Sequence, residues 1–193
     1  MLRGLYDWTM GLAGYRHALW ALAFVSFIES SVFPIPPDVM LIPMILAARE
    51  KAWKIAAVCT LASVLGGAAG YGIGLFAYET VGARILEAFG YLAKFAEFQE
   101  TYNEWGAWAV FIAGVTPFPY KVITITSGVT QLDFVIFMIS SVLARGLRFF
   151  VVAALLWQFG PPIRDFIEKR LGLMFTLFVV LLVGGFVAIR YLL

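Results

Sequence analysis

Long apolar runs make up most of this chain, and they differ in whether charged residues or prolines interrupt them. A helix needs about 20 predominantly apolar residues to cross a bilayer. Residues 55–78 contain no charge, residues 133–158 contain two arginines, and residues 171–190 carry a single arginine at their end. We therefore expect transmembrane helices over 55–78, 133–158 and 171–190.

Two further apolar stretches, 17–49 and 105–132, are broken near their middle by prolines. The arms of the first stretch are too short to span a bilayer. Because proline removes a backbone donor and ends or kinks a helix, we expect each stretch to form a re-entrant hairpin. The expected breaks are Pro34, Pro36 and Pro37 in the first hairpin and Pro117 and Pro119 in the second.

The two breaks share one motif with the charge reversed. Pro34-Ile-Pro36-Pro-Asp38-Val39 has the same spacing as Pro117-Phe-Pro119-Tyr-Lys121-Val122. Paired broken helices in two halves of a membrane protein point to a transport site. A weaker match of Ser63 with Ser141 extends the similarity into the following span. Hairpins that enter from opposite faces, each followed by a span, would form an inverted repeat.

The other segments predict structure at the membrane surface. Residues 79–104 carry apolar residues at helical spacing among glutamates, which is typical of an amphipathic helix lying on the membrane. A loop helix packed on the other spans is an equally weighted alternative. Residues 1–16 contain aromatic residues that suit the headgroup level, so we expect an interfacial N-terminal segment.

Composition supports this assignment to the membrane. Hydrophobic residues make up 62% of the chain and charged residues 13%, whereas soluble domains carry about a quarter charged residues. The formal net charge of +2 does not indicate a nucleic-acid partner. The lone cysteine, Cys59, cannot form an internal disulfide and is expected to be a small packing residue.

Five ionisable residues are expected at membrane depth: Glu29, Asp38, Lys121, Arg145 and Arg148. A charge at the bilayer centre costs about 2.5–3.5 kcal/mol on the insertion scale, so such residues face a partner or a watery cavity. One interpretation is a polar chamber between the hairpin tips and the arginine-bearing span. The alternatives are salt bridges that only stabilise the fold and, for Lys121, a side chain that reaches the interface.

The chemistry of these residues suits a carrier of anions. Arg145 and Arg148 lie one turn apart on a helix, and a guanidinium donates two parallel hydrogen bonds to phosphate. Two acids against three bases leave one excess positive charge, which one anionic head group would compensate. Lys121, Arg145 and Arg148 are therefore the candidate phosphate-binding residues. Glu29, desolvated among apolar neighbours, is expected to bind a proton reversibly.

Other functional classes find little support in the sequence. Its one histidine, His17, lies near an expected surface, and no cluster of ligands suits a metal. A Walker-type glycine loop is also missing. We therefore expect no enzymatic activity, no cofactor and no metal. Gly66, Gly70 and Gly74 recur at four-residue spacing, which indicates a helix face that another backbone can approach closely.

The order of these motifs resembles that of the DedA family, also called VTT-domain or SNARE-associated membrane proteins, and is closest to its YqaA-like branch. The resemblance covers about residues 20–160 and rests on four segments: Glu29 to Asp38, Gly66-Gly-Ala-Ala-Gly70-Tyr-Gly72-Ile-Gly74, Thr116 to Lys121, and Arg145-Gly-Leu-Arg148-Phe. It implies two opposed re-entrant hairpins and movement of phospholipids or polyprenyl phosphate that depends on the proton gradient. It also implies that the family's membrane acids fall on Glu29 and Asp38, the candidate proton-coupling residues. The second hairpin departs from better-studied branches, because it carries Lys121 where they have arginines.

We thus expect an all-α polytopic membrane protein with one membrane domain over 17–160. Its expected partners are protons and membrane lipids with anionic head groups, and a homo-oligomer is left open. Lysines and arginines in the loops predict a cytoplasmic N-terminus, and the resemblance implies a bacterial inner membrane. We expect leaflet-to-leaflet lipid transport of a flippase or scramblase kind; the alternatives are a proton-coupled small-ion or solute transporter and a non-transporting scaffold.

Overall fold

The computed structural model describes residues 17–32, 36–116, 118–160 and 162. Within these residues every regular element is helical, as the sequence predicts. The elements are α2 (Ala18–Ser31), α3 (Asp38–Ala47), the 3₁₀ turn η1 (Arg49–Lys51), α4 (Ala52–Ala77), the π turn η2 (Tyr78–Gly82), α5 (Ala83–Ala88), α6 (Leu92–Val115), α7 (Tyr120–Val129) and a last helix, Phe134–Gly160. The expected segments 1–16 and 171–190, together with Pro34 and Pro117, lie outside the described residues.

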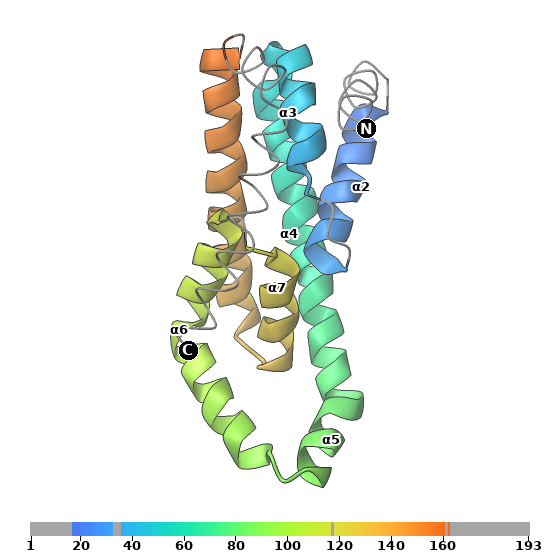
Figure 1. Ribbon diagram of the computed structural model, residues 1–193, viewed down its shortest axis with the longest axis vertical. Coiled ribbons are helices and arrows are strands. Elements are labelled where there is room, and N and C mark those ends of the chain that lie inside the picture. The colour runs from blue at the N-terminus through green and yellow to red at the C-terminus, as the bar shows by residue number, and fades with distance from the viewer. Residues whose placement is uncertain (1–16, 33–35, 117, 161, 163–193) are drawn as a thin grey trace.

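Two of the described helices are long and apolar enough to cross a membrane. One is the continuous helical stretch Arg49–Ala88 of 40 residues, and the other is the last helix of 27 residues. The first contains the expected span 55–78, and the second contains all of the expected span 133–158 except its first residue. Figure 1 shows that α4, with its extension through α5, runs along the full length of the molecule, so it is the scaffold for the shorter helices.

The shorter helices form two helix-break-helix units at opposite ends of the molecule (Figure 1). α2 descends from the upper end to mid-height and α3 returns, whereas α6 rises from the lower end and α7 turns back down. Pro37 is the N-cap of α3 and Pro119 is the N-cap of α7. Proline suits the start of a helix because its missing N–H is not needed there, and this explains why both breaks are followed at once by a new helix.

The stretch 79–104 does not form the single amphipathic helix that was one of our two expectations. The α4 helix continues through η2 into α5, Gly90 then adopts a φ of +71°, and α6 starts at Leu92. Glycine tolerates this left-handed conformation without steric cost, so the chain reverses there. Beyond the turn, α6 continues unbroken to Val115, and the boundary expected at residue 105 is absent.

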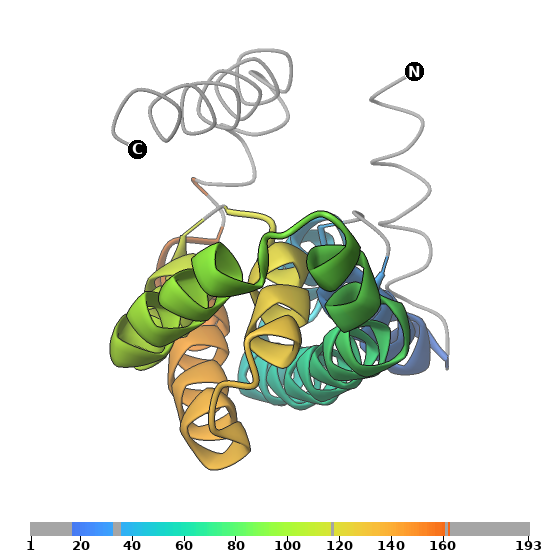
Figure 2. The ribbon, with the colours of Figure 1, turned by 90° about the horizontal axis from the view of Figure 1, so that it is seen from below.

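Small residues let the central helices approach closely. A Cβ atom at Gly66 would collide with the Phe27 carbonyl of α2, and one at Gly74 would collide with the Ile125 carbonyl of α7. A Cβ at Gly70 would lie 3.1 Å from the Ser30 carbonyl and would also meet Thr124. The glycine stripe of α4 is therefore the contact surface for the first arm of one hairpin and the second arm of the other. Figure 2 shows α7 between α4 on one side and α6 and the last helix on the other.

The core has two apolar parts with a polar layer between them. The upper part consists of residues from α2, α3, the first half of α4 and the end of the last helix, including Leu22, Leu41, Cys59 and Phe149. The lower part contains Tyr71, Val110, Tyr120, Leu132 and Phe137. Along both α4 and the last helix, buried polar residues lie between these parts, among them Ser63, Ser141 and Arg145. The polar layer thus coincides with the level at which the hairpins break.

Candidate functional site

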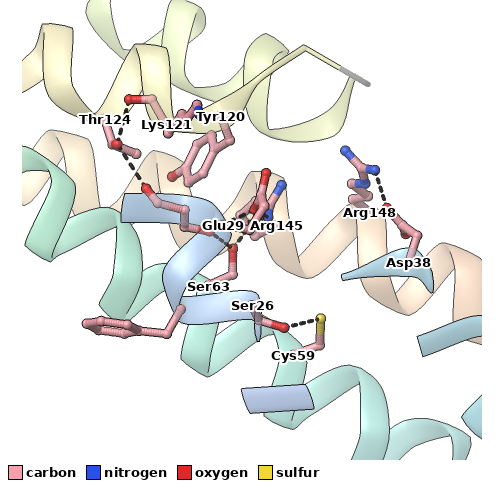
Figure 3. Close-up of polar contacts among 12 residues, drawn as sticks. Ser26, Glu29, Asp38, Cys59, Ser63, Tyr120, Lys121, Thr124, Arg145 and Arg148 are labelled. Atoms are coloured by element: carbon pink, nitrogen blue, oxygen red, sulfur yellow. Dashed lines mark hydrogen bonds and ion pairs between the residues drawn. The ribbon is translucent and has the colours of Figure 1, made fainter. Parts of the chain in front are cut away.

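The centre of the polar layer is an ion pair between Arg145 and Glu29. The Nη2 atom of Arg145 lies 2.7 Å from the Oε2 atom of Glu29, and their side chains are 1% and 14% exposed. The Nε atom of Arg145 also donates to the Ser63 hydroxyl at 2.6 Å (Figure 3). The last helix, α2 and α4 therefore meet at one guanidinium, which is shielded almost completely from the surroundings.

Two aromatic rings enclose this guanidinium. Its central carbon lies 4.6 Å from the ring centroid of Tyr120 and 4.8 Å from that of Phe149. The electron-rich faces of aromatic rings attract cations, and more strongly so when the cation is desolvated. The Tyr120 hydroxyl donates to Ser141 at 2.5 Å, which fixes the ring in place. The start of α7 thus contributes directly to holding Arg145.

Serine hydroxyls complete the polar layer around the pair. Ser30 donates to Glu29 Oε2 at 3.1 Å, and its hydroxyl lies 2.6 Å from that of Ser63. Sequence reasoning assigned no role to Ser30, Ser63 or Tyr120. The signal that could have found Ser63 is the internal repeat, which aligns it with Ser141. Ser63 accepts a hydrogen bond from Arg145 itself, and Ser141 accepts one from Tyr120, whose ring packs on Arg145.

A second ion pair joins Arg148 to Asp38. The Arg148 Nη2 atom lies 2.6 Å from Asp38 Oδ2, and Nη1 donates to the Thr116 carbonyl at 2.9 Å. The two side chains are 20% and 22% exposed, so this pair is much more accessible than the first. Asp38 lies in the first turn of α3, where the positive end of the helix dipole stabilises a carboxylate.

Lys121 occupies a different position from either arginine. Its Nζ atom donates to the Val32 carbonyl at 3.3 Å, and its side chain is partly exposed. The neighbouring Thr124 donates to the Ser30 carbonyl at 3.1 Å. Both bonds link the first turns of α7 to the end of α2. The second hairpin is therefore attached to the first by side-chain-to-backbone bonds.

The structure brings all five predicted ionisable residues to the same level, but it does not join them into one cluster. Each arginine is paired with a different acid, so the two guanidinium groups do not form a shared fork for a single phosphate. Arg145 is enclosed, whereas Arg148 and Lys121 are accessible from outside the packed core. Within the described ranges, no group of three metal-ligating side chains lies together.

The outer surface around this polar layer is apolar. One face of the last helix carries exposed aliphatic side chains along its whole length, and these are Val135, Ile136, Ile139, Val142, Leu143, Leu147, Val151 and Leu155. Extended exposed apolar surface of this kind marks contact with a membrane or a partner. The opposite face of the same helix contains Arg145 and Phe149. The helix therefore separates an apolar exterior from the charged layer.

Comparison with known proteins supports a membrane family. A family model for the VTT domain matches residues 35–158, which include Asp38, Lys121 and both arginines. An uncharacterized protein of Haemophilus influenzae is 44% identical over 168 residues, covering 85% of this chain and 87% of that protein. An uncharacterized protein of Histophilus somni is 43% identical over 168 residues, which again cover 85% of this chain and 87% of that protein. No solved structure matches the chain. With the family model covering more than half of a chain of apolar helices, the protein belongs to the VTT-domain family of membrane proteins, also called the DedA family.

Proposed function

We propose that the protein transports an anionic lipid, a phospholipid or a polyprenyl phosphate, between the two leaflets of the membrane. The observation that carries the proposal is the polar layer at mid-height, where the breaks of two opposed hairpins meet two ion pairs and a lysine. Ionisable groups at membrane depth mark substrate and ion pathways. In this proposal both hairpins are re-entrant, and each reaches the polar layer from a different face of a bacterial inner membrane.

The two ion pairs would have different tasks. Arg148 and Lys121 are accessible and would contact the phosphate of the head group. Arg145 is 1% exposed, so it would hold Glu29 and the hairpins in place instead of binding lipid. A phosphate prefers the bidentate geometry of a guanidinium. Arg148 would become available to a phosphate when its ion pair with Asp38 breaks.

Protons provide a reason for that release. Protonation of Asp38 would remove the negative charge that holds Arg148 and would leave the guanidinium free for a phosphate. Protonation of Glu29 would weaken the enclosed pair in the same way. Binding one proton adds a positive charge and binding one monoanionic head group removes one, so the net charge of the layer stays the same when it takes up both together. We therefore assign the proposed proton coupling to Glu29 and Asp38.

A non-transporting scaffold is the second candidate, and one observation favours it. Both acids of the polar layer are paired with arginines at 2.6–2.7 Å, an arrangement that also describes purely structural salt bridges. In a scaffold the pairs would never open. A proton-coupled transporter of small ions or solutes would use the same layer without the need for a guanidinium at position 148.

Lipid exchange in reconstituted vesicles tests the proposal. We expect Arg148→Lys to lower the exchange of a labelled anionic phospholipid by about tenfold. A guanidinium can bind the Thr116 carbonyl and, at the same time, either Asp38 or a phosphate through its planar fork, and an ammonium lacks this geometry. Arg148→Gln should be slower still. Arg84→Gln is the matched control, since Arg84 is exposed on α5, away from the polar layer.

The outcomes separate the candidates. Equal exchange by the parent and Arg148→Lys would contradict phosphate binding by this guanidinium. A parent protein that moves protons or small ions but not lipid would favour the solute transporter. A parent that is folded and monodisperse but moves neither would favour the scaffold. Fluorescence quenching of the lipid and a pH-sensitive dye inside the vesicles measure both activities in one preparation.

A further inference from the structure

A helix that ends inside a membrane leaves backbone carbonyls without partners. The last four carbonyls of any helix lack intrahelical hydrogen bonds, and lipid offers no water to replace them. Two helices of this protein, α2 and α6, end at mid-height of the molecule (Figure 1). Their C-cap residues are Val32 and Thr116. The question for both ends is which group satisfies these carbonyls.

At the end of α2 the donor comes from the other hairpin. Lys121, in the first turn of α7, donates to the Val32 carbonyl at 3.3 Å. A cation in the first turn is unfavourable for its own helix, because the dipole places positive charge there, whereas the C-terminus of α2 attracts it. The position of Lys121 is therefore explained by the end of α2 and not by α7.

At the end of α6 the donor is Arg148, and the first hairpin holds it in place. Arg148 uses Nη1 for the Thr116 carbonyl at 2.9 Å and Nη2 for Asp38 at 2.6 Å. Asp38 lies at the start of α3, and in the repeated proline motif it occupies the position that Lys121 occupies in the second copy. A carboxylate cannot donate a hydrogen bond to a carbonyl, so an acid at this position needs a guanidinium between itself and the helix end.

We propose that the two hairpins cap each other. The charged residue in the first turn of each hairpin's second arm, Asp38 or Lys121, positions the cap on the end of the other hairpin's first arm. Lys121 does so directly, and Asp38 does so through Arg148. These two contacts, the cross-caps, account for the reversed charge of the repeated motif. The inference goes beyond the proposed transport and does not depend on it. Its mechanical consequence is that neither hairpin can move away without uncapping the other.

A third basic residue provides a matched control. Arg49 donates to the Trp157 carbonyl near the end of the last helix, so it makes the same kind of bond as the cross-caps. The turn between α3 and α4, which carries Arg49, and the end of the last helix lie at the upper end of the molecule in Figure 1 and not at mid-height. There, water can replace the guanidinium as a donor. Loss of Arg49 should consequently matter far less than loss of Lys121.

Hydrogen exchange of the full chain in phosphatidylcholine nanodiscs, read by mass spectrometry, tests the cross-caps. We expect Lys121→Met to accelerate exchange of the amides of residues 28–32 by about tenfold, because this factor corresponds to the free energy that a hydrogen bond to a charged group usually contributes. Asp38→Asn should accelerate exchange of the amides of residues 112–116, although Asp38 does not lie on α6. Lys121→Arg keeps a donor and should restore slow exchange at 28–32, and Arg49→Met should change neither segment.

The crossed pattern decides the outcome. If Lys121→Met accelerates exchange within α7 alone, and Asp38→Asn within α3 alone, the cross-caps are refuted. Unchanged exchange in both variants, or equal acceleration by Arg49→Met, would refute them as well. Should Lys121→Met not yield folded protein, Asp38→Asn still decides the matter at the end of α6, because faster exchange confined to α3 or unchanged exchange at 112–116 would refute the cross-caps.

Discussion

At the scale of single residues, Arg145 is the one charged side chain that the described part of the chain buries fully. Its guanidinium is held by Glu29, by two serine hydroxyls and between the rings of Tyr120 and Phe149. Removing water from a charge is costly unless its partners replace the lost solvation. Together these contacts replace the lost solvation, and Glu29 carries the compensating negative charge.

We predict that Glu29→Gln strongly destabilises the protein. Breaking a buried pair by removing one partner costs about 3–5 kcal/mol, because the other charge stays buried without compensation. The double variant Glu29→Gln/Arg145→Gln removes both charges and should recover most of this loss. Thermal unfolding of the parent, the two single variants and the double variant in one detergent gives the coupling energy between the two sites.

A Glu29→Gln variant as stable as the parent would contradict this view of the pair. The same four proteins also serve the transport assay. A double variant that folds but does not exchange lipid would show that the pair is needed for more than folding. Arg84→Gln again controls for the loss of a positive charge at an exposed position.

At the scale of the elements, close approach of α4 and α7 depends on glycine in both helices. A Cβ at Gly128 would collide with the Tyr71 carbonyl of α4, and a Cβ at Gly74 would collide with the Ile125 carbonyl of α7. The two glycines thus lie on facing sides of one crossing. Close backbone contact of this kind stabilises helix pairs in membranes, where packing replaces the hydrophobic effect as the driving force.

We predict that Gly74→Ala destabilises the protein by about 1–3 kcal/mol, the usual cost of overpacking, or more if the backbone cannot shift. Gly72→Ala is the control within the same helix, since a Cβ at Gly72 would meet nothing within 4 Å. Size-exclusion profiles after a heating series compare the two variants. If both alanine variants stayed folded up to the same temperature as the parent, the crossing of α4 and α7 would have to be looser than the structure shows.

At the scale of the whole molecule, the two hairpins reach the polar layer from opposite ends (Figure 1). The connection Arg49–Lys51 lies at one end, and the turn at Gly90 lies at the other. Because the positive-inside rule counts lysine and arginine in short loops, the end with Arg49, Lys51 and Lys54 is expected on the cytoplasmic side. The turn at Gly90 is then expected on the outer side.

We predict that cysteines at positions 51 and 87 are labelled from opposite sides of the membrane. The parent for this experiment is Cys59→Ser, since Cys59 is buried and the exposed positions 51 and 87 then carry the sole thiol. A membrane-impermeant maleimide applied to cells and to inverted vesicles gives the reading. Labelling of Lys51→Cys and Glu87→Cys from the same side would contradict the orientation and the full crossing of Arg49–Ala88.

Much of the fold could be predicted from the sequence, because the rules that govern it are local. Apolar runs without charge must be helices in a membrane, and prolines must break them. The positions of the long helices, the two breaks and the five ionisable residues follow from these rules. The turn at Gly90, which separates α5 from α6, could not be predicted. A single glycine in a polar segment is equally compatible with a chain reversal and with a continuous helix.

Tertiary structure alone decided what the charged residues do. Glu29 and Arg145 are separated by 116 positions and Asp38 and Arg148 by 110, and no local pattern states which acid meets which base. The sequence placed both arginines on one helix face as equals. Packing made them different, because Tyr120 and Phe149 enclose Arg145 while Arg148 reaches the accessible end of α6. Burial and pairing depend on contacts between distant segments, and these exist only once the helices have assembled.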